Sequence, residues 1–173
     1  DRAPIDESLP LLVVKQRQPA WPADQQIEPA VVVVVHEDRR APPVTALQLA
    51  QRRGRPRPLF LGAAPKVILA HLPTGSLHKL MNAQMPDIAA AGLPTQWPEF
   101  RRHFARIRKA GYYVSTGELE PRLSAVAVPL LAHDDQVLGA LSLVSSVQRM
   151  AMIDTAKLTP LLQRAASDIC SRL

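Results

Sequence analysis

Two apolar runs joined by a short polar segment constrain the fold of this chain most strongly. Ser124–Leu131 is nearly all apolar, and Val137–Val144 is a second apolar run. Short apolar runs bounded by turn signals are typical of strands that are buried on both faces. The segment His133–Asp135 between them is predicted to be a turn, since aspartate side chains hydrogen-bond to nearby backbone N–H groups. The pattern therefore predicts two consecutive apolar strands, of which Ser124–Leu131 is central and buried on both faces.

An earlier strand is expected to begin at Val114. The residues that follow it, Ser115–Glu118, are too polar and too interrupted by glycine to continue that strand as core. Short polar side chains are thus set beside apolar walls, which is the composition of a small-molecule pocket. The polar residues concerned are Ser115, Thr116, Ser124 and Ser142.

Pro98–Ala110 is the clearest predicted helix. Phe100, Phe104 and Ile107 recur at helical spacing and give it one apolar face. Gly111 is expected to end the helix, because glycine readily adopts the left-handed conformation found after a last turn. The basic residues within 101–109 lie on another face of this helix, as on any solvated helix, although contact with DNA phosphates is an alternative.

Three further helices are predicted. Ala64–His71 and Gly75–Gln84 are short segments upstream of the long helix. The C-terminal helix is expected to begin with Thr159 as its N-cap, because Pro160 suits a first turn. Asp154–Lys157 is then expected to form a separate turn.

Proline dominates the N-terminal third of the chain. Nine of the 17 prolines lie in residues 1–58, and proline both fixes φ and removes a backbone donor. Short strands with irregular connections are therefore expected there. The candidate strands are Leu11–Lys15, Ala30–His36 and Val44–Leu49.

Length and composition indicate one globular domain. The chain has 173 residues, 47% of them hydrophobic, and a net charge of +6. Cys170 is the single cysteine, so no intrachain disulfide can form, as is usual in a reducing compartment. No apolar run approaches the roughly 18 residues of a membrane span. We expect a cytoplasmic protein without membrane contact, and a first residue other than Met is consistent with a fragment.

Sequence motifs for catalysis and cofactors are absent. No GxSxG, P-loop or GxGxxG motif occurs, and the five histidines show no zinc spacing. Glu118 and Glu120 resemble an acid/base pair only in their spacing, and loop carboxylates are common. We therefore expect no catalytic residue, no metal and no cofactor.

Two segments resemble a known family. Gly111–Glu118, GYYVSTGE, is similar to the GYAVSxGE motif of the effector-binding domain of IclR-type bacterial transcriptional regulators, and Pro58–Pro73, PLFLGAAPKVILAHLP, resembles their PLHxxAxGKAxLAxLP block. The resemblance covers roughly residues 55–173. Residues 1–54 form a divergent N-terminal segment that contributes strands or a linker.

The resemblance implies an α+β fold of the GAF/profilin type, with a mostly antiparallel sheet of five or six strands and flanking helices. It implies a sensor that binds a small organic acid as its effector and controls DNA binding by an N-terminal winged helix-turn-helix, which the sequence does not reveal. Relatives form homodimers or homotetramers through these domains.

The family also suggests which residues contact the effector. The loop Gly62-Ala63-Ala64 would offer backbone N–H groups at a helix N-terminus, which favours an anion. Ser115 and Ser142 would each form one hydrogen bond. Leu123, Ala125 and Val144 would form an apolar wall, which suggests an aromatic or branched acid. The chain departs from the family pattern at Phe60, Pro65 and Arg122, which replace a common histidine and two common glycines.

Two other functions remain open from the sequence. One is a small-molecule-binding enzyme such as a hydrolase, which would need a nucleophile beside a base. The other is a structural oligomerisation domain whose pocket has degenerated, since alanines stand where polar groups would bind a ligand.

Overall fold

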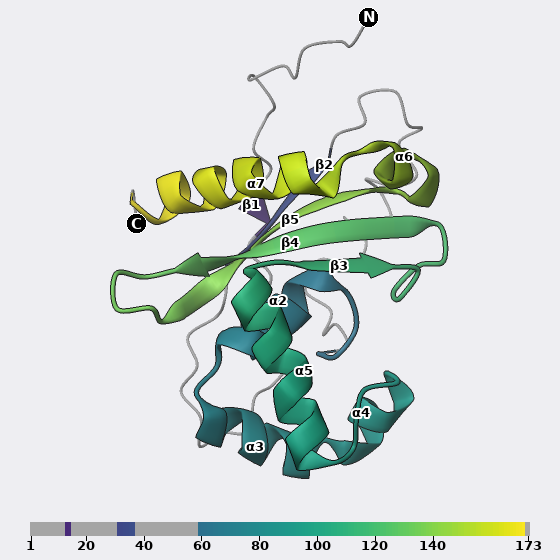
Figure 1. The fold of residues 1–173 in the computed structure, drawn as a ribbon, viewed down its shortest axis with the longest axis vertical. Coiled ribbons are helices and arrows are strands. Elements are labelled where there is room, and N and C mark those ends of the chain that lie inside the picture. Colours follow the sequence, from purple (N-terminus) through teal and green to yellow (C-terminus); the bar gives the residue numbers. More distant parts are fainter. Residues whose placement is uncertain (1–12, 15–30, 37–58, 172–173) are drawn as a thin grey trace, which may run out of the picture.

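The described strands form one five-stranded sheet. The computed structural model describes residues 13–14, 31–36 and 59–171, and its strands lie in the order β1-β2-β5-β4-β3 (Figure 1). Strand β2 runs parallel to β5, and the other three neighbouring pairs are antiparallel. The α+β class and the mostly antiparallel sheet are therefore as predicted. The strands are β1 (Val13–Val14), β2 (Val31–His36), β3 (Tyr113–Thr116), β4 (Leu123–Leu131) and β5 (Val137–Ser146).

Helices cover both faces of this sheet. The helices that precede β3 lie on one side, and the two that follow β5 lie on the other (Figure 1). The first group is α2 (Ala63–His71), α3 (Thr74–Ala83), α4 (Met85–Ala90) and α5 (Trp97–Ala110). The second group is α6 (Val147–Met152) and α7 (Thr155–Cys170). No helix in the described part of the chain is long and apolar enough to span a membrane.

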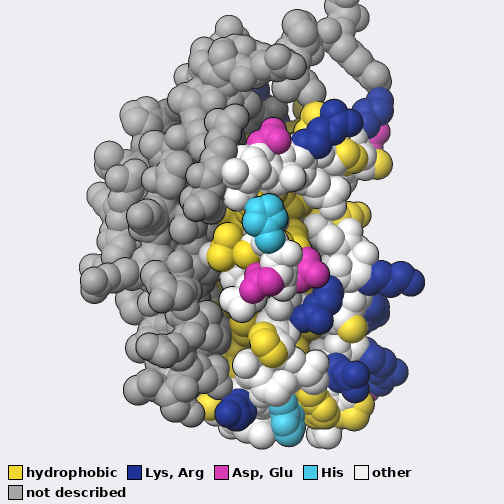
Figure 2. All heavy atoms as spheres, turned by 90° about the vertical axis from the view of Figure 1, so that its left-hand side faces the viewer, with side chains coloured by type: hydrophobic (Ala, Val, Ile, Leu, Met, Phe, Trp, Pro, Cys, Tyr) yellow, Lys and Arg dark blue, Asp and Glu magenta, His cyan; other side chains and the backbone are white. Residues whose placement is uncertain are grey.

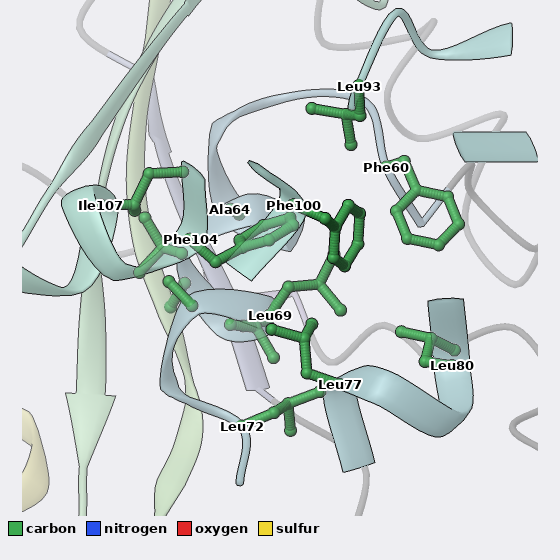
Figure 3. Close-up of a cluster of buried hydrophobic side chains, with 14 of the residues drawn as sticks. Phe60, Ala64, Leu69, Leu72, Leu77, Leu80, Leu93, Phe100, Phe104 and Ile107 are labelled. Atoms are coloured by element: carbon green, nitrogen blue, oxygen red, sulfur yellow. The ribbon is translucent and has the colours of Figure 1, made fainter. Parts of the chain in front are cut away.

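Each face of the sheet has its own hydrophobic core. Phe60, Leu69, Phe100 and Phe104 belong to the core between the sheet and the helices that precede β3 (Figure 3). The core on the opposite face joins β4 and β5 to α7. It contains Val126, Val128, Leu130, Leu141, Leu143, Met150, Leu162 and Ala166. The prediction that Ser124–Leu131 forms a central strand buried on both faces is confirmed, because β4 lies between two strands and contributes residues to both cores.

Helix α5 follows its prediction closely. Phe100, Phe104 and Ile107 are its buried residues. Gly111 ends it with φ of 73°, and the Gly111 N–H donates to the carbonyl oxygens of Ile107 and Arg108. A residue with a Cβ would be strained in this left-handed conformation, so the glycine fixes the point where the chain leaves the helix for β3.

The predicted start of the C-terminal helix is wrong. Helix α7 begins at Thr155 and runs through Pro160. Asp154 is the N-cap, with its Oδ1 accepting a hydrogen bond from the Ala156 N–H at 3.0 Å. Proline at this position removes only one helical hydrogen bond. The residues before Pro160 add contacts of their own, because Leu158 packs against the core on β4 and β5 and Thr159 is buried.

Four other segments differ from prediction. Ser115 and Thr116 belong to β3, because their backbones pair with Ala125 and Ser124 of β4 whatever the polarity of their side chains. Strand β5 likewise continues to Ser146. Helices α4 and α6 were not predicted. The expected strand Val44–Leu49 lies outside the described residues, whereas β1 and β2 fall within two of the three expected N-terminal strands.

Candidate functional site

The five candidate residues on the sheet share one face. Ser115 on β3 and Val144 on β5 are both paired with Ala125 of β4. Ser142 is paired with Ala127, two residues after Ala125 on the same strand. Leu123 lies two residues before Ala125 on β4. Partners on neighbouring strands point to the same face, as do residues two apart on one strand. Ser115, Leu123, Ala125, Ser142 and Val144 are therefore presented together.

This face is the one that α2 covers. Ala127 and Ala140 belong to the core that also contains Val67 and Leu69 of α2, and Ala125 packs against that core. The three remaining candidates, Gly62, Ala63 and Ala64, stand at the N-terminal end of α2. All eight candidate residues thus belong to one layer, between the sheet and the start of this helix.

The start of α2 presents backbone donors. Gly62 is its N-cap residue, with φ of 90° and ψ of 168°, and has no side chain with which to cap the helix. The first four N–H groups of a helix have no partner within it. The Gly62 N–H donates to Oε2 of Glu118 at 2.7 Å, and Pro65 has no N–H. Among the described residues, the N–H groups of Ala63 and Ala64 are then the ones left to meet a ligand, while their methyl groups are buried in the core (Ala64 is labelled in Figure 3).

A buried charge cluster adjoins this helix start, and the sequence interpretation missed it. The Lys66 Nζ donates to both carboxylate oxygens of Glu118 at 2.8 Å. The same Nζ donates to Tyr113 Oη at 3.3 Å, and Tyr113 Oη donates to Glu118 Oε1 at 3.2 Å. Nζ also lies 5.0 Å from the centroid of the Tyr113 ring. The Lys66 side chain is 5% exposed and that of Glu118 is 20% exposed, so water screens this pair weakly.

His103 lies beside Tyr113 of this cluster. Its ring centroid is 6.4 Å from that of Tyr113. Its Nε2 is buried and makes no hydrogen bond to any described residue. Burial lowers the pKa of His103, and the positive charges of Lys66 and Arg106 lower this pKa further. The imidazole is therefore neutral near neutral pH.

One sequence signal could have revealed the cluster. Lys66 is the single charged residue in the otherwise apolar helix AAPKVILAH before its terminal histidine. A charged residue at a buried position must be paired. Its partner could not be read from the sequence, because Glu118 is 52 residues away.

The two loop glutamates interact with different cations. Glu118 is bonded to Lys66, whereas Glu120 Oε1 lies 3.6 Å from the Arg122 Nε. The Arg122 side chain is 82% exposed, as expected of a solvated loop residue. Within the part of the chain that the structure describes, no group of three His, Cys, Asp or Glu residues is arranged to hold a metal ion.

The basic residues of α5 are mostly solvated. Arg101, Arg102, Arg106 and Lys109 are exposed, as the sequence predicted for this face of the helix. Figure 2 shows Lys and Arg side chains along one margin of the face drawn there, while acidic side chains lie nearer its middle. Arg108 is exposed as well, but its guanidinium donates to the carbonyl oxygens of Ala70 and Leu72 at the end of α2.

Comparisons with known proteins agree on one family. The model of the bacterial transcriptional regulator IclR C-terminal domain matches residues 27–171. A probable HTH-type transcriptional regulator, ArcR of Halobacterium salinarum, is 27% identical over 138 residues, which are 79% of this chain and 52% of that protein. The chain spans about half the length of the curated relatives it matches.

Solved structures share the fold. The transcriptional regulator YaiJ superposes with a TM-score of 0.61 and 24% identity, over 70% of this chain and 68% of that one. The inducer-binding domain of a double mutant of the PobR transcription factor from Acinetobacter, in complex with 3-hydroxybenzoic acid, superposes with a TM-score of 0.50 and 23% identity over 66% of each chain. Its sequence and its fold together show that the chain belongs to the C-terminal domain family of the bacterial IclR transcriptional regulators.

Proposed function

We propose that this chain is the effector-sensing domain of an IclR-type transcriptional regulator and binds a small organic acid. The observation that carries the proposal is the shared position of the candidate residues. Five of them lie on the sheet face that α2 covers, and the other three form the start of that helix. The N–H groups at a helix start favour a carboxylate, and a mostly apolar surface with a few polar groups suits the rest of a small ligand.

The proposed ligand has one carboxylate and an apolar body. The N–H groups of Ala63 and Ala64 would accept the carboxylate, while Ser115 and Ser142 would orient a hydroxyl or keto group. Leu123, Ala125 and Val144 would contact an aromatic or branched carbon skeleton. Support by analogy comes from the PobR inducer-binding domain, whose structure contains 3-hydroxybenzoic acid.

In the intact regulator, ligand binding would control DNA binding by a winged helix-turn-helix domain outside this chain. An effector can shift the balance between two arrangements only by binding one of them more tightly. The proposal includes a GAF/profilin-like domain over residues 55–173 to which strands of residues 1–54 contribute, and a cytoplasmic homodimer or homotetramer. The exposed apolar side chains of Met152 and Leu161 on α6 and α7 are compatible with a subunit contact.

A thermal-shift screen against mono- and dicarboxylic, hydroxy and aromatic acids tests the proposal. A ligand at 100 times its dissociation constant adds about 2.7 kcal/mol of stability, which corresponds to roughly 5–10 °C for a domain of this size. Ser142→Ala and Ala63→Leu should reduce the shift. Ser167→Ala, at an exposed position on α7, is the matched control and should retain it. Absence of a shift across the panel would reject the proposal.

A further inference from the structure

A short segment of this chain occupies the anion-binding position at the start of α2. Residues 117–122, here called the strap, connect β3 to β4. Through Glu118 the strap inserts a carboxylate that accepts hydrogen bonds from the Gly62 N–H and from Lys66. Leu119 of the strap lies over the same position, because a Cβ added to Gly62 would be 2.8 Å from its Cδ1.

Binding of a second anion beside Glu118 at this position is electrostatically unfavourable. The helix start supplies about half a positive charge, and Lys66 supplies one more. Glu118 already neutralises most of this charge in a buried environment. A second carboxylate at Ala63 and Ala64 would face Glu118 at close range, and two adjacent carboxylates disfavour each other's charged form. Binding of an acid and insertion of Glu118 therefore oppose each other.

We infer that the carboxylate of Glu118 is an internal competitor of the effector, and that a bound acid displaces it and pairs with Lys66 in its place. This inference rests on the proposed function and specifies its ligand as a carboxylate small enough to bind where the Glu118 side chain now lies. Lys66 thereby becomes the cation that recognises the effector. Displacement of Glu118 opens the strap, which links occupancy of the site to the β3–β4 edge of the sheet.

The two ends of the strap are held by backbone hydrogen bonds that do not involve the Glu118 side chain, so they remain when an acid displaces it. Gly117, with φ of 71°, donates its N–H to the Leu123 carbonyl oxygen at 2.9 Å. The Arg122 carbonyl oxygen accepts from the Val147 N–H at 3.0 Å. These two bonds anchor the ends of the strap to the sheet and to α6. In the structure, Glu118 and Leu119 are the strap residues that contact the start of α2, so a rotation of the strap centre suffices to release it.

Acetate is the probe for the first test. In Glu118→Gln the side chain keeps its shape but loses the competing charge and leaves Lys66 without a carboxylate. We expect this variant to bind acetate at least about tenfold more tightly than the wild-type chain by calorimetry. Glu120→Gln, in the same strap but with its carboxylate 3.6 Å from the Nε of the exposed Arg122, is the matched control and should bind acetate as the wild type does. Lys66→Met added to Glu118→Gln should abolish the gain.

Equal acetate affinity in the wild type and Glu118→Gln would overturn the inference, as would a gain that persists without Lys66. If acids in the screen stabilise the wild-type chain while Glu118→Gln binds acetate no better, the sensor function stands and the competition fails. If Glu118→Gln gains acetate binding while no acid stabilises the wild type, the anion site stands and the proposed sensor fails.

A second measurement needs no variant and holds even if Glu118→Gln fails to fold. Hydrogen exchange of the wild-type chain is compared with and without acetate at about 100 mM, because a ligand with a millimolar dissociation constant needs such a concentration to fill its site. We expect the Leu123 amide, which donates to the Glu120 carbonyl oxygen of the strap at 2.9 Å, to exchange faster with acetate, while the core amides of β4 remain protected. Slower exchange across the strap would mean that the acid closes it, which contradicts the inference.

Discussion

The Lys66 Nζ lies 2.8 Å from each carboxylate oxygen of Glu118, although the two residues are 52 positions apart in the chain. The pair joins the first turn of α2 to the segment after β3. The two partners are unequally placed, since the Lys66 side chain is 5% exposed and the Glu118 side chain 20% exposed. We therefore expect removal of the Lys66 charge and removal of the Glu118 charge to lower the free energy of unfolding by different amounts.

Removal of the glutamate charge should destabilise the chain more than removal of the lysine charge. Glu118→Gln leaves a buried ammonium without its carboxylate, and breaking a buried pair in this way costs about 3 kcal/mol. Lys66→Met leaves Glu118 with the Gly62 N–H and partial access to water, so we expect a loss of about 1–2 kcal/mol. Urea unfolding of both variants measures the difference, and a larger loss for Lys66→Met would contradict this account of the pair.

Gly62→Ala should destabilise the chain by about 1–3 kcal/mol. The backbone at Gly62 has a conformation that is essentially restricted to glycine, and the added Cβ would lie 2.8 Å from Leu119 Cδ1. Gly75→Ala is the matched control. A Cβ at Gly75 meets no atom within 4 Å, and this residue lies in the first turn of α3. There we expect a gain of up to about 1 kcal/mol, measured by thermal and urea unfolding.

Arg108→Ala should destabilise the end of α2. The Nε and Nη2 atoms of Arg108 donate to the carbonyl oxygens of Ala70 and Leu72 at 2.6 and 2.7 Å. Hydrogen bonds to charged groups contribute about 1.5–3 kcal/mol, and we expect a loss in this range. Arg106→Ala removes an exposed guanidinium from the same helix and should change the free energy of unfolding by less than about 0.5 kcal/mol. A loss of unfolding free energy for Arg108→Ala that is as small as that for Arg106→Ala would mean that the Arg108 hydrogen bonds contribute little.

Stability should fall as the pH is lowered below about 6.5. The folded-state pKa of His103 is depressed, mainly by burial and then by Lys66. In this range the unfolded chain binds a proton that folded His103 does not, so the free energy of unfolding decreases with falling pH until the folded imidazole is protonated too. Burial depresses the pKa of His71 as well, and its contribution has the same sign.

His103→Phe should reduce this pH dependence without abolishing it. The ring is retained, the titrating group is lost, and the buried Nε2 that makes no hydrogen bond to a described residue is removed. The free energy of unfolding is measured between pH 5 and 7.5, a range of about one unit or more on each side of the ordinary histidine pKa. An unchanged slope in His103→Phe would assign the dependence to other groups. His133→Gln, in the exposed turn between β4 and β5, is the control.

Several elements were predictable because their signals are local. The apolar runs that became β4 and β5 must be buried whatever else the chain does, and the spacing of Phe100, Phe104 and Ile107 defined α5. Strand alternation then determines that Ser115 and Ala125 share a face once they are paired. The role of these residues in effector binding remains a prediction.

Other features required the tertiary structure. Pro160 suggested a helix start locally, but the packing of Leu158 against the sheet and the Asp154 N-cap favour a helix that begins at Thr155. The parallel pairing of β2 with β5 joins strands about 100 residues apart, and no local pattern encodes such a partner.

The sequence by itself determined the central strands, the apolar face of α5 and its glycine end, because each depends on the polarity and backbone freedom of neighbouring residues. Only the tertiary structure decided that Lys66 and Glu118 meet at the start of α2. A buried charge requires a partner, and which of the chain's carboxylates fills that requirement depends on how the sheet brings the end of β3 to the helix.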